Sequence, residues 1–170
     1  KLLNGEADVT IAALPEKLPA GLEFIKIIET PLVFIAPLHC EKESLPRTTS
    51  TDWLTSPMIM AERGLGRRRL DSWFKEHDIQ PNIYAQVAGN EAIIAMVSLG
   101  CGLGVVPRLV LDMSPMRTQV TTMEVSPQLA PFCVGVCTFQ KNLANSTVQA
   151  FWRVAGQQTS EDNDPVARRE

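Results

Sequence analysis

The sequence predicts an α/β fold, and three observations support that class. First, residues 87–107 carry apolar side chains three and four positions apart, as on one face of a helix, followed by a short β-branched run that stops at Pro107. Second, similar short apolar runs recur along the chain between turns rich in glycine and proline. Third, 45% of the 170 residues are hydrophobic, which is enough for the core of one domain or of two small lobes.

The first part of the chain predicts three short strands after the end of a helix. A last helical turn stops at Gly5, and residues 8–13 form a strand that is small and apolar enough to be covered on both faces. Residues 22–28 alternate apolar and polar side chains, as a half-buried strand does. An apolar strand at residues 32–36 comes next. Residues 37–50 are polar and carry prolines, which indicates a loop or the entry to a second lobe.

Residues 51–87 predict a helix between two strands. Thr51 and Asp52 can cap a short helix. Residues 57–61 are expected to form a small buried strand, and a glycine-containing loop at residues 62–66 then opens into a helix at residues 67–77. The apolar stripe of that helix is Leu70, Trp73, Phe74 and His77. A strand at residues 82–87 follows.

The central segment, residues 87–107, predicts a helix, a glycine turn and a buried strand. Asn90 precedes the periodic residues, and its side chain can cap the free amides of the first helical turn, while Glu91 is favourable near the positive helix end. Gly100 follows the last periodic residue and suits the left-handed conformation that ends many helices. Gly89, Asn90 and Glu91 are therefore expected at an open helix N-terminus, which can hold a carboxylate.

The last part of the chain predicts two more strands and a final helix. A short helical turn is expected at residues 107–113, and strands are expected at residues 120–125 and 132–139. Asn145 begins the final helix, whose inward-facing residues are expected to be Val148, Phe151, Trp152 and Ala155. Residues 157–170 show no periodicity and are expected to be disordered.

Charge and cysteine content narrow the class of protein. A net charge of −3 argues against a broad basic face for nucleic acid within this segment. The four cysteines lie mostly in apolar runs without a CxxC pair, which favours reduced, buried thiols in a cytoplasmic protein over a disulfide framework. We expect neither a signal peptide nor a membrane helix, because no apolar run approaches the ~20 residues that a membrane span needs.

The sequence offers no candidate catalytic, metal-binding or cofactor-binding group. His39 lies in a proline-bearing loop and His77 at a helix end, where a cation is favourable, so a structural role is expected for both. Neither histidine has metal-ligand spacing to the other or to a cysteine pair. The glycines of residues 100–104 follow a helix and lead into a strand, so they read as a turn and not as a phosphate-binding loop.

Two helix N-termini are the candidate anion sites. They lie at residues 64–67 and 89–91, each directly after a predicted strand, where open α/β sheets bind their ligands. Arg67, Arg68 and Arg69 spread over ~300° of helical arc, so they cannot all face one ligand. From these residues alone, a ligand site and two ordinary strand-to-helix turns are equally supported.

Several segments resemble one known family. LLNGEADVTIA at residues 2–12, PLVFIAPLHC at residues 31–40, PMIMAERGLGRRRLDSWF at residues 57–74 and MVSLGCGLGVVPRLV at residues 96–110 are similar to segments of LysR-type transcriptional regulators. Residues 61–74, 89–107 and 149–154 resemble the branch of that family that activates isoleucine and valine biosynthesis. The resemblance covers about residues 1–156.

This resemblance implies an effector domain of two α/β lobes with the type 2 periplasmic-binding-protein fold. Residues 1–36 and 141–156 would form lobe I, and residues 37–140 would form lobe II. The chain would be truncated at its N-terminus, since the winged helix-turn-helix that binds promoter DNA would precede Lys1. The implied partners are a small organic-acid effector, promoter DNA through that separate domain, and further copies of the chain in a dimer or tetramer, with no membrane.

The resemblance also implies where the effector binds, with no cofactor and no metal. The branch implies a small hydroxy-keto acid such as acetolactate or acetohydroxybutyrate. Several relatives with aromatic-acid effectors have an arginine at the position of Ala13, so Arg63 or Arg67 is expected to supply that anion contact here. Asn90 or a backbone amide can meet a keto or hydroxyl oxygen. The expected effector-binding residues are Ala13, Leu14, Pro15, Glu62, Arg63, Gly64, Arg67, Gly89, Asn90 and Glu91.

The competing class is a solute-binding protein or an amino-acid-pathway enzyme lobe of the same fold. A periplasmic receptor needs an export signal, and an enzyme needs acid and base groups that converge in its cleft. Neither feature is evident in the sequence, so we expect a protein that is not an enzyme. A third class, a purely structural interaction module, would bind no small molecule.

Overall fold

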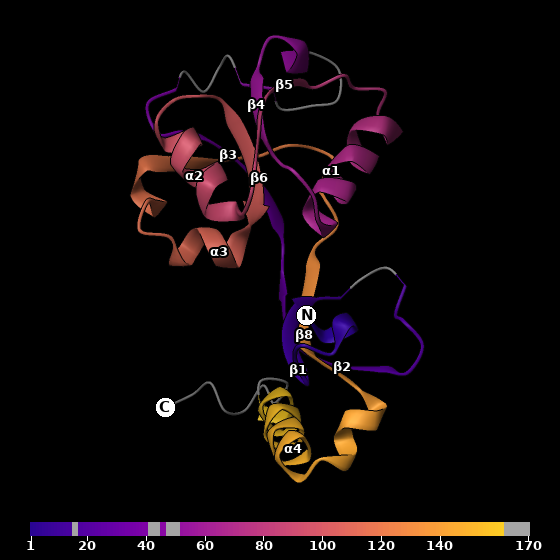
Figure 1. The fold of residues 1–170 in the computed structure, drawn as a ribbon. Helices are drawn as coiled ribbons and strands as arrows, with labels where there is room; N and C mark the ends of the chain where they lie inside the picture. The colour runs from indigo at the N-terminus through magenta and orange to yellow at the C-terminus, as the bar shows by residue number, and fades with distance from the viewer. Residues whose placement is uncertain (15–16, 41–44, 47–51, 162–170) are drawn as a thin grey trace. The chain divides into compact units, whose positions relative to one another are not determined.

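The computed structural model describes residues 1–14, 17–40, 45–46 and 52–161. They form two compact units, each with a β-sheet of its own (Figure 1). Unit 1 comprises Lys1–Glu29 and Phe132–Glu170, and unit 2 comprises Thr30–Pro131. The predicted α/β class is therefore confirmed.

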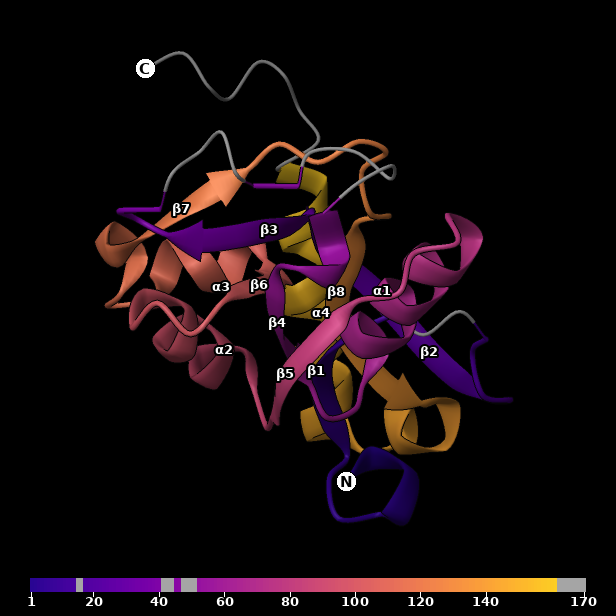
Figure 2. The ribbon, with the colours of Figure 1, turned by 90° about the horizontal axis from the view of Figure 1, so that it is seen from above.

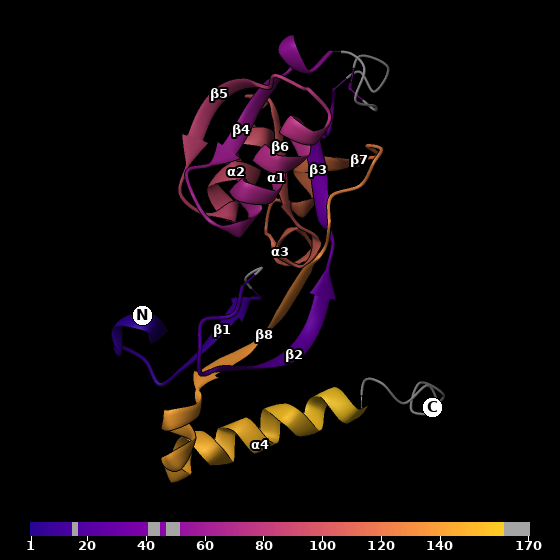
Figure 3. The ribbon, with the colours of Figure 1, turned by 90° about the vertical axis from the view of Figure 1, so that its right-hand side faces the viewer.

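Unit 1 combines a three-stranded sheet with a long helix. The strand order is β1 (Val9–Ala13), β8 (Phe132–Phe139) and β2 (Leu22–Thr30), so that β1 and β2 are edge strands. β1 runs antiparallel to β8. The short helical turn η1 (Leu2–Asn4) precedes β1, and the turn η5 (Gln140–Ala144) precedes the helix α4 (Ser146–Glu161). α4 lies beside this sheet (Figure 3). Its residues Val148 and Ala155 are buried.

Unit 2 is a five-stranded mixed sheet covered by helices. The strand order is β5 (Asn82–Val87), β4 (Pro57–Ala61), β6 (Leu103–Pro107), β3 (Leu32–Pro37) and β7 (Val120–Met123). β4 is parallel to β5 and β6, whereas β3 is antiparallel to β6 and β7. The helices and helical turns are η3 (Asp52–Leu54), α1 (Leu65–Glu76), α2 (Asn90–Ser98), α3 (Arg108–Met113) and η4 (Arg117–Gln119).

The two longer helices of unit 2 cover opposite faces of its sheet for a topological reason. α1 connects β4 to β5 on one side of β4, and α2 connects β5 to β6 on the other side. Since crossovers between parallel strands are right-handed, reversing direction along the sheet takes the second helix to the other face. Figures 1 and 2 show α1 and α2 on opposite sides of β4.

Each face of this sheet has its own core. On the α1 face, the ring of Phe34 packs against Trp53 and Trp73, with ring centroids 5.3 and 5.5 Å apart. The neighbouring Ile35 points to the α2 face, because successive strand residues alternate between faces. The core on the α2 face comprises Ile35, Ile59, Ile93, Ile94, Val97, Val106, Leu111 and Val120. The predicted apolar stripe of α1 is confirmed by the burial of Leu70, Trp73 and Phe74.

The helix, glycine turn and buried strand predicted for residues 87–107 are confirmed. At the end of α2 the Gly100 amide bonds the Val97 carbonyl at 2.9 Å, and the Cys101 amide bonds the Met96 carbonyl at 3.1 Å. These two bonds form a Schellman C-cap, with Gly100 at φ +83 in the left-handed region. The strand β6 follows and is buried along its whole length.

The two units divide the chain at positions other than those expected for the lobes. β3 was expected in lobe I, but it pairs with β6 and β7 and belongs to unit 2. β8 was expected in lobe II, but it pairs with β1 and belongs to unit 1. The divisions therefore fall after Glu29 and after Pro131 instead of after residues 36 and 140.

The ends of some elements also differ from expectation. α1 begins at Leu65 instead of residue 67. α4 continues past Gly156 to Glu161, because one glycine weakens a helix by only ~1 kcal/mol relative to alanine and does not end it. Phe151, expected to face inward, is 48% exposed. The rest of the tail expected to be disordered, residues 162–170, and the predicted cap Thr51 lie outside the described residues.

The cysteines are free thiols, as expected, although only Cys137 is buried and the other three are half-buried. Burial raises the pKa of the Cys137 thiol. Among the described residues, no group of three or more histidine, cysteine or acidic side chains could hold a metal ion. The helices in that part of the chain are all too short or too polar to cross a bilayer.

Candidate functional site

Two glycine loops meet at one edge of the unit 2 sheet. β4 and β5 are parallel neighbours, and their last residues, Ala61 and Val87, lie opposite each other. The Glu62 amide bonds the Val87 carbonyl at 3.0 Å. The loops at residues 62–64 and 88–89 therefore leave the sheet side by side, and each leads directly into a helix. This edge is where open α/β sheets bind ligands, outside the carboxyl ends of strands whose helices go to opposite faces.

Glycine supplies the N-cap of both helices. Gly64 precedes α1 with φ 112, and Gly89 precedes α2 with φ 87, both in the region that favours glycine. Neither helix has a hydrogen bond from a capping side chain. Among the described residues no side chain accepts from the first-turn amides of these helices, and such amides can donate to a carboxylate.

The prediction that Asn90 caps α2 is wrong. Asn90 is the first helical residue, and Gly89 occupies the N-cap position without a side-chain bond. The chain needs a positive φ at the cap in order to turn from β5 into α2, and glycine adopts this conformation more readily than asparagine. Asn90 is half-buried at the helix start, and its amide group is available for another role.

Arg67 ties three elements together beneath the two loops. Its Nη1 donates to the Ala61 carbonyl at 2.9 Å and to Gln86 Oε1 at 2.8 Å. Its Nε lies 2.8 Å from both carboxylate oxygens of Asp71, one turn further along α1. The side chain is 18% exposed. One guanidinium thus joins the end of β4, the edge strand β5 and the first turns of α1.

The three consecutive arginines have different surroundings and contacts, as their spread around the helix predicted. Arg68 is exposed. Arg69 Nη1 donates to the Ala130 carbonyl at 2.8 Å and also bonds the Pro131 carbonyl, so it holds the last residues of unit 2 against α1. Trp73 supports the same stretch, because its Nε1 donates to the Pro127 carbonyl at 2.9 Å.

Glu91 is held by a neighbouring helix. Its Oε2 accepts a hydrogen bond from Ser114 Oγ at 2.9 Å, just beyond the end of α3. Ser114 is 6% exposed, and its Oγ also accepts from the Met116 amide at 3.4 Å. The Glu91 side chain therefore anchors the start of α2 to α3. Its backbone amide, which belongs to the first helical turn, is the part that could meet an anion.

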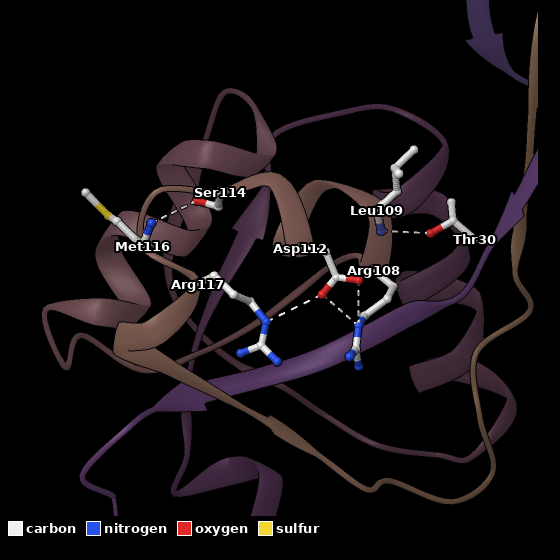
Figure 4. Close-up of polar contacts among 7 residues, drawn as sticks. All are labelled: Thr30, Arg108, Leu109, Asp112, Ser114, Met116 and Arg117. Atoms are coloured by element: carbon white, nitrogen blue, oxygen red, sulfur yellow. Dashed lines mark hydrogen bonds and ion pairs between the residues drawn. The ribbon is translucent and has the colours of Figure 1, made fainter.

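The start of α3 is tied to the first residue of unit 2. The Leu109 amide donates to Thr30 Oγ1 at 3.0 Å, and Thr30 is 3% exposed (Figure 4). Asp112 accepts from Arg108 Nε at 2.9 Å and lies 3.4 Å from Arg117 Nε. These side-chain bonds hold α3 at both of its ends.

The other predicted site residues are divided between the two units. Glu62 and Arg63 are exposed in the first glycine loop, and Arg63 bonds none of the described side chains. Ala13 and Leu14 belong to unit 1, at the end of β1, where the Leu14 amide donates to the Cys133 carbonyl at 2.7 Å. Pro15 lies outside the described residues.

Unit 2 also contains a pocket that the sequence does not predict. It has a volume of about 360 Å³ and lies at the opposite end of α2 from Gly89. The pocket is lined by Pro37, Leu38, His39, Ser98, Leu99, Gly100, Thr118 and Gln119. These residues come from three separate stretches of chain, so no local pattern could have indicated it.

His77 has the structural position expected of it, with Nδ1 2.7 Å from the Trp73 carbonyl.

Comparison with known proteins yields one family. The family model described as the LysR substrate binding domain matches residues 1–160. The transcriptional activator IlvY of Salmonella typhimurium is 42% identical over 158 residues, which are 91% of this chain and 54% of that protein. IlvY of Escherichia coli is 41% identical over 158 residues, with 91% and 53% covered. The chain thus spans about half the length of the curated relatives it matches.

Solved structures share the fold at lower identity. The regulatory domain of Synechocystis PCC6803 CcmR in complex with 2-PG has a TM-score of 0.77 and 21% identity, covering 92% of this chain and 75% of that one. The effector-binding domain of QuiR in complex with shikimate has a TM-score of 0.74 and 21% identity, covering 92% and 73%.

Proposed function

The chain belongs to the LysR family of transcriptional regulators as an effector-binding domain, and on that premise we propose that it senses a small hydroxy-keto acid such as acetolactate or acetohydroxybutyrate. The proposed output is activation of isoleucine and valine biosynthesis. It is supported by the identity of 41–42% to two proteins named IlvY. The solved relatives named with bound 2-PG or shikimate support the more general role of sensing a small molecule.

One observation carries the proposal: two glycine-capped helix N-termini lie side by side at the carboxyl edge of β4 and β5. In the proposed site, first-turn amides of α1 and α2 donate to the effector carboxylate. Asn90, which does not cap the helix, is the proposed partner of the keto or hydroxyl oxygen. Arg63 is the proposed mobile cation, because it is exposed in the first loop and bonds none of the described residues.

The proposed activity is sensing and requires no chemical step. The effector acts by binding one conformation of the regulator more tightly than another, and its free energy of binding then shifts the balance between them. Promoter DNA is the proposed partner of the whole regulator, which we propose acts as a cytoplasmic homo-oligomer. Ala13, Leu14 and Pro15 stay in the proposal as effector contacts on the family resemblance alone.

Isothermal titration calorimetry tests the proposal. The protein is titrated with freshly prepared acetolactate, and with shikimate, the ligand in the QuiR structure, as the control. We expect saturable heat at or below millimolar acetolactate and none with shikimate. Absence of heat with both acetolactate and acetohydroxybutyrate at millimolar concentrations would exclude the proposed effector. Equal affinity for shikimate would exclude the proposed selectivity.

A further inference from the structure

The Arg67 guanidinium has the contacts of a structural clamp. Three of its five N–H groups are used within the protein: Nε on Asp71, and both hydrogens of Nη1 on the Ala61 carbonyl and Gln86 Oε1. The Asp71 carboxylate, 2.8 Å away, already neutralises its charge. Little uncompensated positive charge is left for an effector, although Nη2 bonds none of the described residues.

The bonded groups lie directly before the two loops. Ala61 is the last residue of β4 and precedes the loop that contains Gly64. Gln86 is followed by Val87, whose carbonyl accepts from the Glu62 amide. Among the described strands β5 pairs with β4 alone, so no strand on its other side contacts Gln86. Arg67 fixes the end of β4 and the end of β5 at the same time.

We infer that Arg67 is a positioning residue for the effector site, one that sets the distance between the two helix N-termini without touching the effector. This inference rests on the proposed function and replaces the expectation that Arg67 contacts the effector. Arginine suits the task because its planar fork reaches two acceptors and a carboxylate at fixed angles. Lysine places a single ammonium group and cannot make the same set of bonds.

The test compares three variants with the wild type by calorimetry. Arg67→Lys keeps the charge and loses the fork, and Gln86→Leu leaves Arg67 intact but removes one anchor. Arg108→Lys is the matched control, since Arg108 forms the same i,i+4 pair with Asp112 at 2.9 Å on α3. Each protein is titrated with acetolactate and with its uncharged methyl ester.

The two ligands separate positioning from direct contact. We expect Arg67→Lys and Gln86→Leu to weaken both the acid and the ester by a similar factor of roughly ten, the lower end of the loss seen when residues that orient metal ligands are replaced in metal sites. Arg108→Lys should stay within about twofold of the wild type. Weaker binding of the acid alone in Arg67→Lys would overturn the inference in favour of a direct carboxylate contact. A lower melting temperature with unchanged Kd values would show a merely structural residue.

If the wild type binds neither ligand, the proposed effector is refuted, but the role of Arg67 in holding the two loops is not. Hydrogen exchange then tests that role directly. The Glu62 amide, bonded to Val87, reports the contact between the two loops. We expect its exchange to accelerate in Arg67→Lys and Gln86→Leu and to remain unchanged in Arg108→Lys. Unchanged exchange in all three variants would overturn the inference.

Discussion

Adding one methyl group at Gly104 should destabilise the protein. Gly104 lies in the fully buried strand β6, under α2. A Cβ there would lie 2.5 Å from Ile93 Cγ2 and 3.0 Å from Val97 Cγ2, well inside ordinary contact distance. Both neighbours are β-branched, at most 1% exposed, and held on a helix, so neither methyl can move aside without moving the backbone.

The expected loss of stability is the free-energy cost of crowding minus the conformational-entropy gain from replacing glycine. Overpacking a core by one methyl group costs about 1–3 kcal/mol. Replacing glycine by alanine in a strand returns about 0.5–1 kcal/mol. A Cβ contact as short as 2.5 Å puts the crowding in the upper part of its range, so we expect Gly104→Ala to lower the free energy of unfolding by about 1–2.5 kcal/mol. Ile93→Leu, which lacks the Cγ2 methyl, should recover part of that loss when combined with it.

Urea unfolding followed by tryptophan fluorescence measures this loss. Gly156→Ala is the matched control with the opposite sign, because its Cβ would lie 3.8 Å from Ile25 Cδ1 in ordinary contact. Alanine is also the better helix former, so this control should gain about 0.5–1 kcal/mol. A Gly104→Ala protein as stable as the wild type would refute the claim that α2 packs on β6 through that glycine.

Four further measurements test other contacts in the structure. Asn90→Ala should leave the melting temperature unchanged, since Gly89 is the cap, but should weaken acetolactate binding in calorimetry; unchanged affinity removes Asn90 from the site. Asn145→Ala should cost about 1 kcal/mol in urea unfolding, because Asn145 Oδ1 caps the Thr147 amide at 2.9 Å, and no loss would mean the cap is idle. At pH 8 Cys137 should react with a thiol reagent more slowly than the other cysteines, by mass spectrometry of the labelled peptides, because burial raises its pKa above the ordinary 9.0 and lowers its thiolate fraction. Because the Cys137 thiol has a higher pKa in the folded than in the unfolded protein, the free energy of unfolding should decrease as the pH rises above 9.0. An increase of that free energy above pH 9.0 would contradict the raised pKa.

The elements of unit 2 could be predicted because their signals are local. The strands Pro57–Ala61 and Asn82–Val87 are uniform apolar or alternating runs between turn residues, and the structure has them with the predicted bounds. The glycine stop at Gly100 could be predicted for the same reason. Fold class and family likewise follow from short segments, each of which is continuous in the sequence.

What could not be predicted depends on contacts between distant residues. Whether β3 belongs to one unit or the other depends on its pairing with β6 and β7, about which the strand sequence says nothing. Asparagine is a good N-cap residue, but the turn from β5 into α2 requires a positive φ at the N-cap. Gly89 therefore occupies that position, and Asn90 becomes the first helical residue. The bonds of Arg67 to Gln86 and to the Ala61 carbonyl could not be predicted either, because the sequence does not reveal that these groups lie beside it.

The edge strand β1 has a consequence for handling the protein. Within the part of the chain that the structure describes, β1 pairs with β8 alone, and its central Ile11 is 70% exposed. Such a strand presents unused amide and carbonyl groups together with an apolar side chain, the combination that recruits a further strand from another molecule. Samples of this chain should therefore form larger species as concentration rises. Ile11→Lys, which places a charge on that edge, should keep the chain dispersed.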